Sequence, residues 1–192
     1  METFPFVLGT LDPTIGRGYR SPGIHISNVI RYLEEVTGKK DGNYDGWEDA
    51  ALTGFLWEDV MGEALAVQYE REHGDLVAIG ELEHSGLFLT PDRVGIRKGE
   101  DDVIWDFKVT WKSSRTSPPD QVWKWKVQLM CYCYATRCLE GRIAALYVCG
   151  DYQRPSKPKV VGTVFQFSQQ ELVDNWFMIM QGAKALAKQQ QA

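Results

Sequence analysis

Two aspartates and one lysine are the side chains of this sequence whose types and spacing best suit chemistry. Asp92 follows Pro91, and Asp106 lies two positions before Lys108, within the stretch LTPDRVGIRKGEDDVIWDFK at residues 89–108. Two neighbouring carboxylates repel each other unless a cation lies between them, and hard divalent cations such as Mg²⁺ prefer oxygen ligands. A lysine beside such a pair suits chemistry on a water molecule or on a phosphate group.

The elements that position these residues are predicted to be two neighbouring strands joined by a turn. We expect the first strand at about 86–97, carrying Asp92, a turn around Gly99, and the second strand at about 103–109. Side chains alternate between the faces of a strand. One face is therefore predicted to pack on a helix, and pairing of the strands is predicted to bring Asp92 next to Asp106 on the other. The first face holds Val103, Trp105, Phe107 and Val109, and the second holds Ile104, Asp106 and Lys108.

Composition indicates a globular protein. The 192 residues, 44% hydrophobic and 24% charged, predict one domain over 1–192 with a sizeable core. The first residues lack a basic segment and no apolar run approaches 18 residues, so we expect no signal peptide, no membrane span and a cytoplasmic location. The net charge is −5, yet residues 108–126 hold five Lys or Arg against one Asp. An acidic protein with such a basic segment can still bind a polyanion, especially once metal ions neutralise its carboxylates.

The order of the predicted elements indicates a mixed α/β sheet. Before the aspartates we expect an irregular lead-in at 1–24, followed by a helix that is capped by Ser27 and ends near Val36. A loop at 39–46 then leads to a helix at 47–72, a strand at 76–83 and a turn at Ser85–Gly86. After them we expect a loop at 112–117, a helix at 120–139 that stops at Gly141, strands at 142–149 and 160–167, a helix from Ser168 to about 187 and a frayed tail at 188–192.

These motifs together resemble the PD-(D/E)XK nuclease superfamily. Pro91-Asp92 followed by Asp106-Phe107-Lys108 matches its name-giving pattern, and QLMCY at 128–132 resembles the QxxxY motif of the RecB-like and phage-exonuclease branch. Glu58 lies on the preceding predicted helix, where that branch has a His or Glu. The resemblance implies a restriction-endonuclease-like core, an α/β (α+β) fold with a mixed central sheet flanked by helices.

The resemblance also implies a metal-dependent DNA nuclease, most simply an exonuclease of DNA recombination, repair or phage DNA processing. Asp92 and Asp106 would bind one or two Mg²⁺ or Mn²⁺ ions, with the backbone carbonyl of Phe107 as a further ligand. Glu58 would complete the coordination, and Glu63 is the alternative for this role. The metal would lower the pKa of a bound water and stabilise charge on the phosphate.

Three further residues receive roles from the resemblance. Lys108 would hold or help to deprotonate the attacking water, and we expect partial burial to lower its pKa toward this task. Gln128 and Tyr132 lie one helical turn apart, so both can face the site and fix the metal ligands or the DNA strand.

The basic segment suggests contacts with DNA. Lys112, Lys124 and Lys126 are predicted to contact phosphates. The interleaved Trp111, Trp123 and Trp125 either stack on unpaired bases or pack in the core, and Trp123 and Trp125 cannot share one helix face.

The cysteines do not indicate a metal cluster. Cys131, Cys133, Cys138 and Cys149 have no zinc-site spacing, and all follow the DFK strand, whereas relatives with an iron–sulfur cluster have one cysteine upstream of the core. We expect reduced thiols.

Two alternatives stay open on the sequence: a non-cleaving nucleic-acid-binding or assembly module that keeps the nuclease fold, and a structure-specific endonuclease. A degenerate module is expected to lose Asp106 or Lys108, and both are present. The expected partners are linear duplex or single-stranded DNA, further copies of the chain, and a single-strand-annealing or recombination protein, in a bacterial or infected host cytoplasm.

Overall fold

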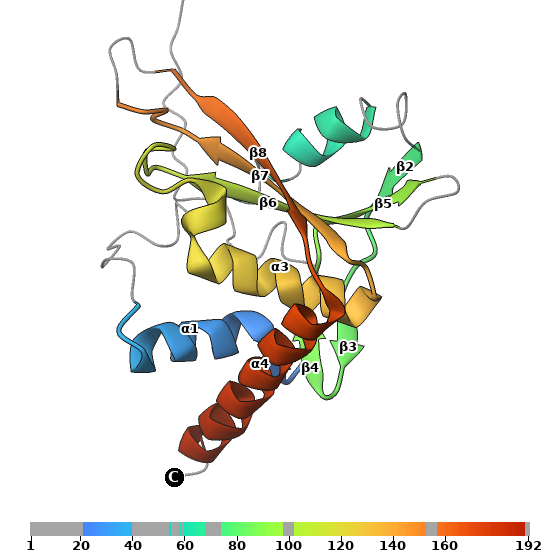
Figure 1. The fold of residues 1–192 in the computed structure, drawn as a ribbon, viewed down its shortest axis with the longest axis vertical. Coiled ribbons are helices and arrows are strands. Elements are labelled where there is room, and N and C mark those ends of the chain that lie inside the picture. Colours follow the sequence, from blue (N-terminus) through green and yellow to red (C-terminus); the bar gives the residue numbers. More distant parts are fainter. Residues whose placement is uncertain are drawn as a thin grey trace, which may run out of the picture.

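The fold consists of two β-sheets with helices packed against them (Figure 1). A computed structural model describes residues 21–39, 54, 58, 60–67, 74–97, 102–152 and 157–190. The larger sheet has the order β2-β5-β6-β7-β8, formed by β2 (Gly74–Val77), β5 (Arg93–Arg97), β6 (Val103–Thr110), β7 (Glu140–Tyr147) and β8 (Lys159–Gln166). The smaller sheet has the order β1-β4-β3, formed by β1 (Ile24–His25), β4 (Leu87–Leu89) and β3 (Leu82–His84).

Strand β6 is the centre of the larger sheet. It pairs with β5 in antiparallel register and with β7 in parallel register, while β2–β5 and β7–β8 are antiparallel. A parallel pair needs a crossover, because the chain must return to the same end of the sheet. The segment between β6 and β7 forms this crossover, and it contains the 3-10 helix η2 (Pro119–Gln121) and helix α3 (Trp123–Thr136). The sheet is therefore mixed, as the sequence predicts.

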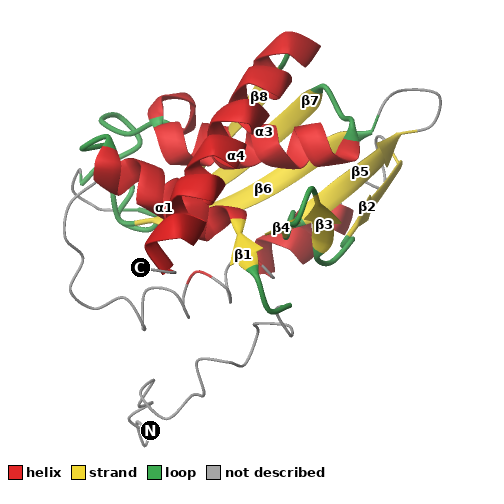
Figure 2. Ribbon diagram, turned by 90° about the horizontal axis from the view of Figure 1, so that it is seen from below, coloured by secondary structure: helices red, strands yellow, loops and turns green. Residues whose placement is uncertain are grey.

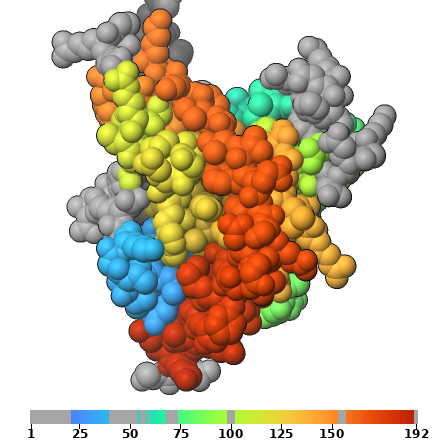
Figure 3. Space-filling view, viewed as in Figure 1, coloured from blue at the N-terminus to red at the C-terminus, as the bar shows by residue number. Residues whose placement is uncertain are grey.

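Helices cover both faces of this sheet. Helices α1 (Ile26–Val36), α3 and α4 (Gln169–Gln190) lie together on one face (Figure 2), and Figure 3 shows α4 crossing in front of α3 and beside α1. The helical residues 60–67 lie on the opposite face (Figure 1). Among the described helices, none has the length and apolar character that crossing a membrane requires.

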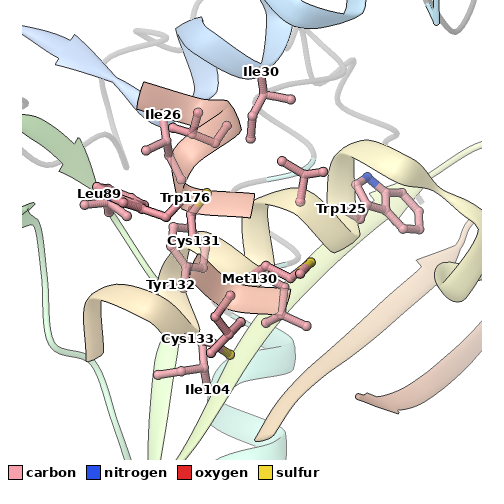
Figure 4. Packing of buried hydrophobic residues seen from close by; sticks show 14 of the residues in the cluster. Ile26, Ile30, Leu89, Ile104, Trp125, Met130, Cys131, Tyr132, Cys133 and Trp176 are labelled. Atoms are coloured by element: carbon pink, nitrogen blue, oxygen red, sulfur yellow. The ribbon is translucent and has the colours of Figure 1, made fainter. Parts of the chain in front are cut away.

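Side chains alternate between the two faces of β6, and this alternation divides the core into two layers. Ile104 belongs to the main cluster with α1, α3 and α4, where Tyr132 and Cys133 of α3 lie between β6 and Trp176 of α4 (Figure 4). Phe107, 1% exposed, packs on the other face against Met61 and Ala144. The predicted packing of the Phe107 face on a helix is confirmed, and apolar burial on both faces fixes the register of β6.

Each of two segments that the sequence predicts as a single strand forms two separate strands in the structure. The segment 76–83 divides into β2 and β3, and the segment 86–97 divides into β4 and β5, with one member of each pair in either sheet. Residues 78–81 and 90–92 connect the sheets. Asp92 therefore lies in the bend just before β5 and not inside a strand. The turn at Ser85–Gly86 is confirmed, and both residues have positive φ angles, 53° and 77°.

The predicted helices exist with different ends. Helix α1 begins one residue before Ser27, with His25 as its N-cap, so Ser27 is no cap. Helix α3 begins at Trp123 and ends at Thr136, before the predicted Leu139, because Arg137 adopts a left-handed conformation with φ 63°; Gly141 lies in β7 and does not stop the helix. Ser168 and Glu171 form the predicted cap of α4 through reciprocal hydrogen bonds, and this helix continues to Gln190.

Some predictions fall outside the described residues: most of the lead-in at 1–24, most of the loop at 39–46, much of the helix at 47–72, and the turn around Gly99.

Candidate functional site

The two predicted aspartates meet at the junction of β5 and β6. The antiparallel register pairs Arg93 with Trp105, so its continuation by one residue places Asp92 opposite Asp106. The backbone N–H of Phe107 donates a hydrogen bond to Asp92 Oδ2 at 2.5 Å. The β6 backbone therefore holds the Asp92 carboxyl in place, although Asp92 itself is outside any strand.

Asp106 is a fully buried carboxyl with one unused oxygen. Its side chain is 0% exposed, and its Oδ1 accepts a hydrogen bond from Lys108 Nζ at 2.7 Å. Its Oδ2 is buried and has no hydrogen-bond partner among the described residues. A buried carboxylate oxygen without a partner is costly, so this atom is suited to a cation.

Burial and mutual repulsion shift the pKa of both carboxyls. Burial, followed by the charge of Asp106, raises the pKa of Asp92 from 3.8 to about 7, against the lowering effects of Lys108, the Phe107 N–H and Arg93. Burial also raises the pKa of Asp106, against Lys108. Without a cation, the site therefore favours a proton on Asp92 at mildly acidic pH.

Lys108 is charged at neutral pH, contrary to the expectation of a lowered pKa. Burial alone would lower the pKa of Lys108, but the charges of Asp106, Asp92 and Glu58 together outweigh burial and raise it. The sequence-based expectation is wrong for the protein without a cation because it considered burial without the carboxylates beside the ammonium group. Here Lys108 donates hydrogen bonds and carries positive charge.

Gln128 and Tyr132 of α3 face the same site. Gln128 Nε2 donates a hydrogen bond to Tyr132 Oη at 2.5 Å, across one helical turn. Burial raises the pKa of Tyr132, and the charges of Asp106 and Asp92 raise it further. The tyrosine hydroxyl therefore lies within the electrostatic reach of both aspartates and remains protonated.

Glu58 lies near the lysine but is not grouped with the aspartates. It is helical and half-buried, and its charge acts on Lys108, whereas Glu63 is exposed. Within the described part of the chain, no three Asp, Glu, His or Cys side chains gather as a metal site. Glu58 as a third ligand stays a prediction. The pair itself has the donor chemistry of a divalent-cation site, with the unused oxygen of Asp106 as its clearest sign.

Arg93 is a residue of this site that the sequence interpretation missed. Its Nη1 donates a hydrogen bond to the backbone carbonyl of Asp92 at 2.9 Å, and its charge lowers the pKa of Asp92. A Cβ atom at Gly62 would lie 3.1 Å from Arg93 Nη2, so the small residue gives the guanidinium room beneath helical residues 60–67. Its position directly after Asp92 was the available signal.

The three predicted phosphate-binding lysines have different surroundings, and their contact with phosphates stays a prediction. Lys124 pairs with Glu34 of α1 at 3.8 Å, and the charge of Lys126 acts on Glu171 of α4. Lys112 lies in the loop after β6, half-buried. Trp125 lies in the hydrophobic core. Trp123 is half-buried, and Lys39 Nζ lies 4.8 Å from the centroid of its ring.

Asp151 anchors the loop after β6. It accepts hydrogen bonds from Ser114 Oγ at 2.6 Å and Ser113 Oγ at 3.2 Å, and Lys159 Nζ lies 3.5 Å from it. The loop that follows Lys108 is thus attached to the β7–β8 connection.

The four cysteines form no disulfide with one another, and three of them are buried. Cys131 accepts a hydrogen bond from Asn175 Nδ2 at 3.4 Å, and burial raises its pKa to about 12. Burial likewise raises the pKa of Cys133. Such thiols are poor nucleophiles at neutral pH.

No family model and no curated protein matches this sequence. Among solved structures, an alkaline exonuclease from Laribacter hongkongensis is similar with a TM-score of 0.50 and 13% identity, covering 95% of this chain and 90% of that chain. A phage-related exonuclease from Haemophilus somnus 129PT has a TM-score of 0.47 and 12% identity, covering 88% of this chain and 94% of that chain. The chain has the α+β fold of the alkaline exonuclease.

Proposed function

We propose that this protein is a Mg²⁺- or Mn²⁺-dependent deoxyribonuclease that acts as an exonuclease. The observation that carries the proposal is the buried Asp106, whose free Oδ2 lies in a site with Asp92 and Lys108. The fold shared with an alkaline exonuclease supports it. A pair of buried carboxyls with an adjacent ammonium group has no evident structural purpose, since an apolar pair would stabilise the fold more.

The proposed ligands of the metal are Asp92 and Asp106, with the backbone carbonyl of Phe107 and Glu58 as further ligands. When bound, the ion supplies a water of lowered pKa and stabilises negative charge on the phosphate. The Phe107 N–H orients Asp92, and the Lys108 ammonium orients Asp106. Two separate donors therefore fix the two carboxylates before any ion binds.

Lys108 is proposed to act as a cation. Because its pKa is raised, it carries a proton at neutral pH and can donate a hydrogen bond to a phosphate oxygen or to the attacking water. Acting as the general base would require losing this proton, which the neighbouring carboxylates oppose. The Gln128–Tyr132 pair is proposed to position the scissile phosphate, since its hydroxyl lies near both aspartates.

A second candidate function has one observation in its favour. Within the described residues, no third carboxylate groups with Asp92 and Asp106. A DNA-binding or assembly module that keeps the fold but does not cleave DNA would not need a third carboxylate. The two functions differ in a single measurable property, cleavage in the presence of a divalent metal.

The biological setting is proposed from the same reasoning: DNA recombination, repair or phage DNA processing in a bacterial or infected host cytoplasm. We propose linear DNA as the substrate, and further copies of the chain or a single-strand-annealing protein as partners.

The test is incubation with linear duplex, circular duplex and single-stranded DNA, with Mn²⁺ or with a chelator. We expect loss of linear but not circular DNA, and only with the metal. Lys108→Met and Asp106→Asn should reduce the cleavage rate by about 10²–10³-fold or more. Lys188→Ala is the matched control, because Lys188 is exposed at the end of α4. DNA binding without cleavage of any substrate would favour the module, and cleavage of circles would identify an endonuclease.

A further inference from the structure

A cavity of about 330 Å³ lies between the end of α1 and the beginning of α3. Its volume is at the small end of the range for ligand sites in proteins. The Asp92–Asp106 pair and Lys108 do not line it. Its lining includes Glu34 and Lys39 from the α1 side, Thr116 and Ser117 from the loop, and Trp123 and Lys124 from α3.

The charged and aromatic groups of this cavity suit an anion attached to a flat ring. Lys39 Nζ lies 4.8 Å from the centroid of the Trp123 ring, so an aromatic surface and a cation are adjacent. Lys124 and Glu34 form an ion pair at 3.8 Å. Two ammonium groups against one carboxylate leave the cavity with one net positive charge.

The ion pair in the cavity is weak enough to be replaced by a ligand. The Lys124 side chain is 37% exposed, and 3.8 Å is long for a hydrogen-bonded pair. Ion pairs of this kind contribute little to stability. A phosphate group can therefore take the place of Glu34 beside Lys124 at small cost.

The beginning of α3 adds donors on the same side. Val122, Trp123 and Lys124 all line the cavity, and within the described residues the N-cap Val122 makes no side-chain capping hydrogen bond. The first turn of α3 contains no acidic residue. The first N–H groups of a helix have no intrahelical partner, and together with the positive end of the helix dipole they favour an anion.

We propose that this cavity binds one unpaired nucleotide of the DNA, with its base against Trp123 and its phosphate between Lys39, Lys124 and the beginning of α3. The inference rests on the proposed function for the identity of the ligand, and it adds a second binding site outside the cleavage site. Base stacking on aromatic side chains is tolerant of sequence and needs an exposed base face. The site therefore distinguishes unpaired from paired DNA.

Helix α3 joins this cavity to the cleavage site. Lys124 and Gln128 are four residues apart and so lie on one side of the helix, about 6 Å apart along its axis. Tyr132 follows one turn later, within electrostatic reach of both aspartates. A single strand that passes along α3 would place one nucleotide in the cavity and a phosphodiester bond a few nucleotides away at Asp106.

The test measures binding of a fluorescent dT oligonucleotide and of an abasic oligonucleotide of equal length to the full chain, by anisotropy in a chelator. We expect the wild type to prefer the dT strand. Trp123→Ala should weaken dT binding about 5- to 150-fold and remove this preference, while Trp123→Phe retains it. Lys124→Ala should reduce the slope of log affinity against log salt by about 0.7. Lys188→Ala is the control.

Glu34→Gln supplies a result that misfolding cannot imitate. Removal of the carboxylate that competes for Lys124 should tighten dT binding, by about two- to fivefold. Unchanged dT binding in Trp123→Ala, or no tightening in Glu34→Gln, would overturn the inference while cleavage by the wild type still upheld the proposed function. A wild type that binds dT with this pattern but cleaves nothing supports the cavity alone. A wild type that binds no DNA in the chelator overturns the inference, and one that also cleaves no DNA with Mn²⁺ overturns both.

Discussion

Asp92→Asn should stabilise the metal-free protein at neutral pH and abolish its response to metal. The amide has nearly the same shape as the carboxyl, and its oxygen can still accept the hydrogen bond from the Phe107 N–H. What changes is charge: Asp92 lies near Asp106 in a buried site, and each carboxyl opposes ionisation of the other. The variant keeps the geometry of the pair and removes the repulsion.

The size of this effect follows from the pKa of Asp92. A rise from 3.8 to about 7 corresponds to about 4 kcal/mol. The folded protein keeps this proton up to about pH 7, whereas the unfolded chain releases it near pH 4. Unfolding therefore releases a proton between these values, and the wild type loses stability as pH rises from 4 to 7. Above pH 7 the loss is complete.

The measurement is urea unfolding of both proteins at pH 4 and pH 8 in a chelator. The free energy of unfolding of the variant, minus that of the wild type, should increase by about 4 kcal/mol between these pH values. Asp102→Asn, at an exposed position, should show no such increase. Mn²⁺ at 100 times its dissociation constant should then stabilise the wild type by about 2.7 kcal/mol and leave Asp92→Asn unchanged. The same pH dependence in wild type and variant would show that the reasoning from burial is wrong.

Three other outcomes test the site and the fold. Lys108→Met should abolish cleavage and lower the free energy of unfolding of the metal-free protein, because Asp106 loses its hydrogen bond and ion pair with Lys108. Calorimetry and a plasmid assay check this, and full activity would contradict the proposed role. Gly141→Ala should destabilise the protein by about 1–3 kcal/mol in urea, since its Cβ would lie 2.8 Å from buried Leu129, and an unchanged midpoint would contradict the packing of β7 on α3. Ser168→Ala should cost about 0.5–2 kcal/mol through loss of the α4 cap, with Ser168→Asp, which can also cap, retaining stability as the control.

The placement of the candidate site residues was predictable because it depends on short-range patterns. Alternation along β6 places Asp106 and Lys108 on one face whatever the rest of the chain does, and pairing with the preceding strand brings Asp92 opposite. The spacing of Gln128 and Tyr132 fixes a common helix face in the same way. The capping pattern at Ser168 is likewise local, and it gives the beginning of α4 correctly.

The division of strands between two sheets was not predictable from local pattern. Gly80, with φ 71°, and Pro91 lie in the two connecting segments, but they do not show that the parts of each segment belong to different sheets. That division arises because β4 pairs with β1, distant in sequence, whereas β5 pairs with β6. The pKa of Lys108 was missed for a similar reason, since it depends on which charges surround the ammonium group. The end of α3 at Arg137 has no local signal either, because a non-glycine residue rarely takes a left-handed conformation.

The backbones that carry the two carboxyls have different structural support. Asp106 lies within β6, paired on both sides, whereas Asp92 lies in residues 90–92, between a strand of each sheet. Helix α1 contacts β1 and β4 of the small sheet. The backbone position of Asp92 therefore depends on how the small sheet packs against α1, while the Phe107 N–H ties its carboxyl to β6.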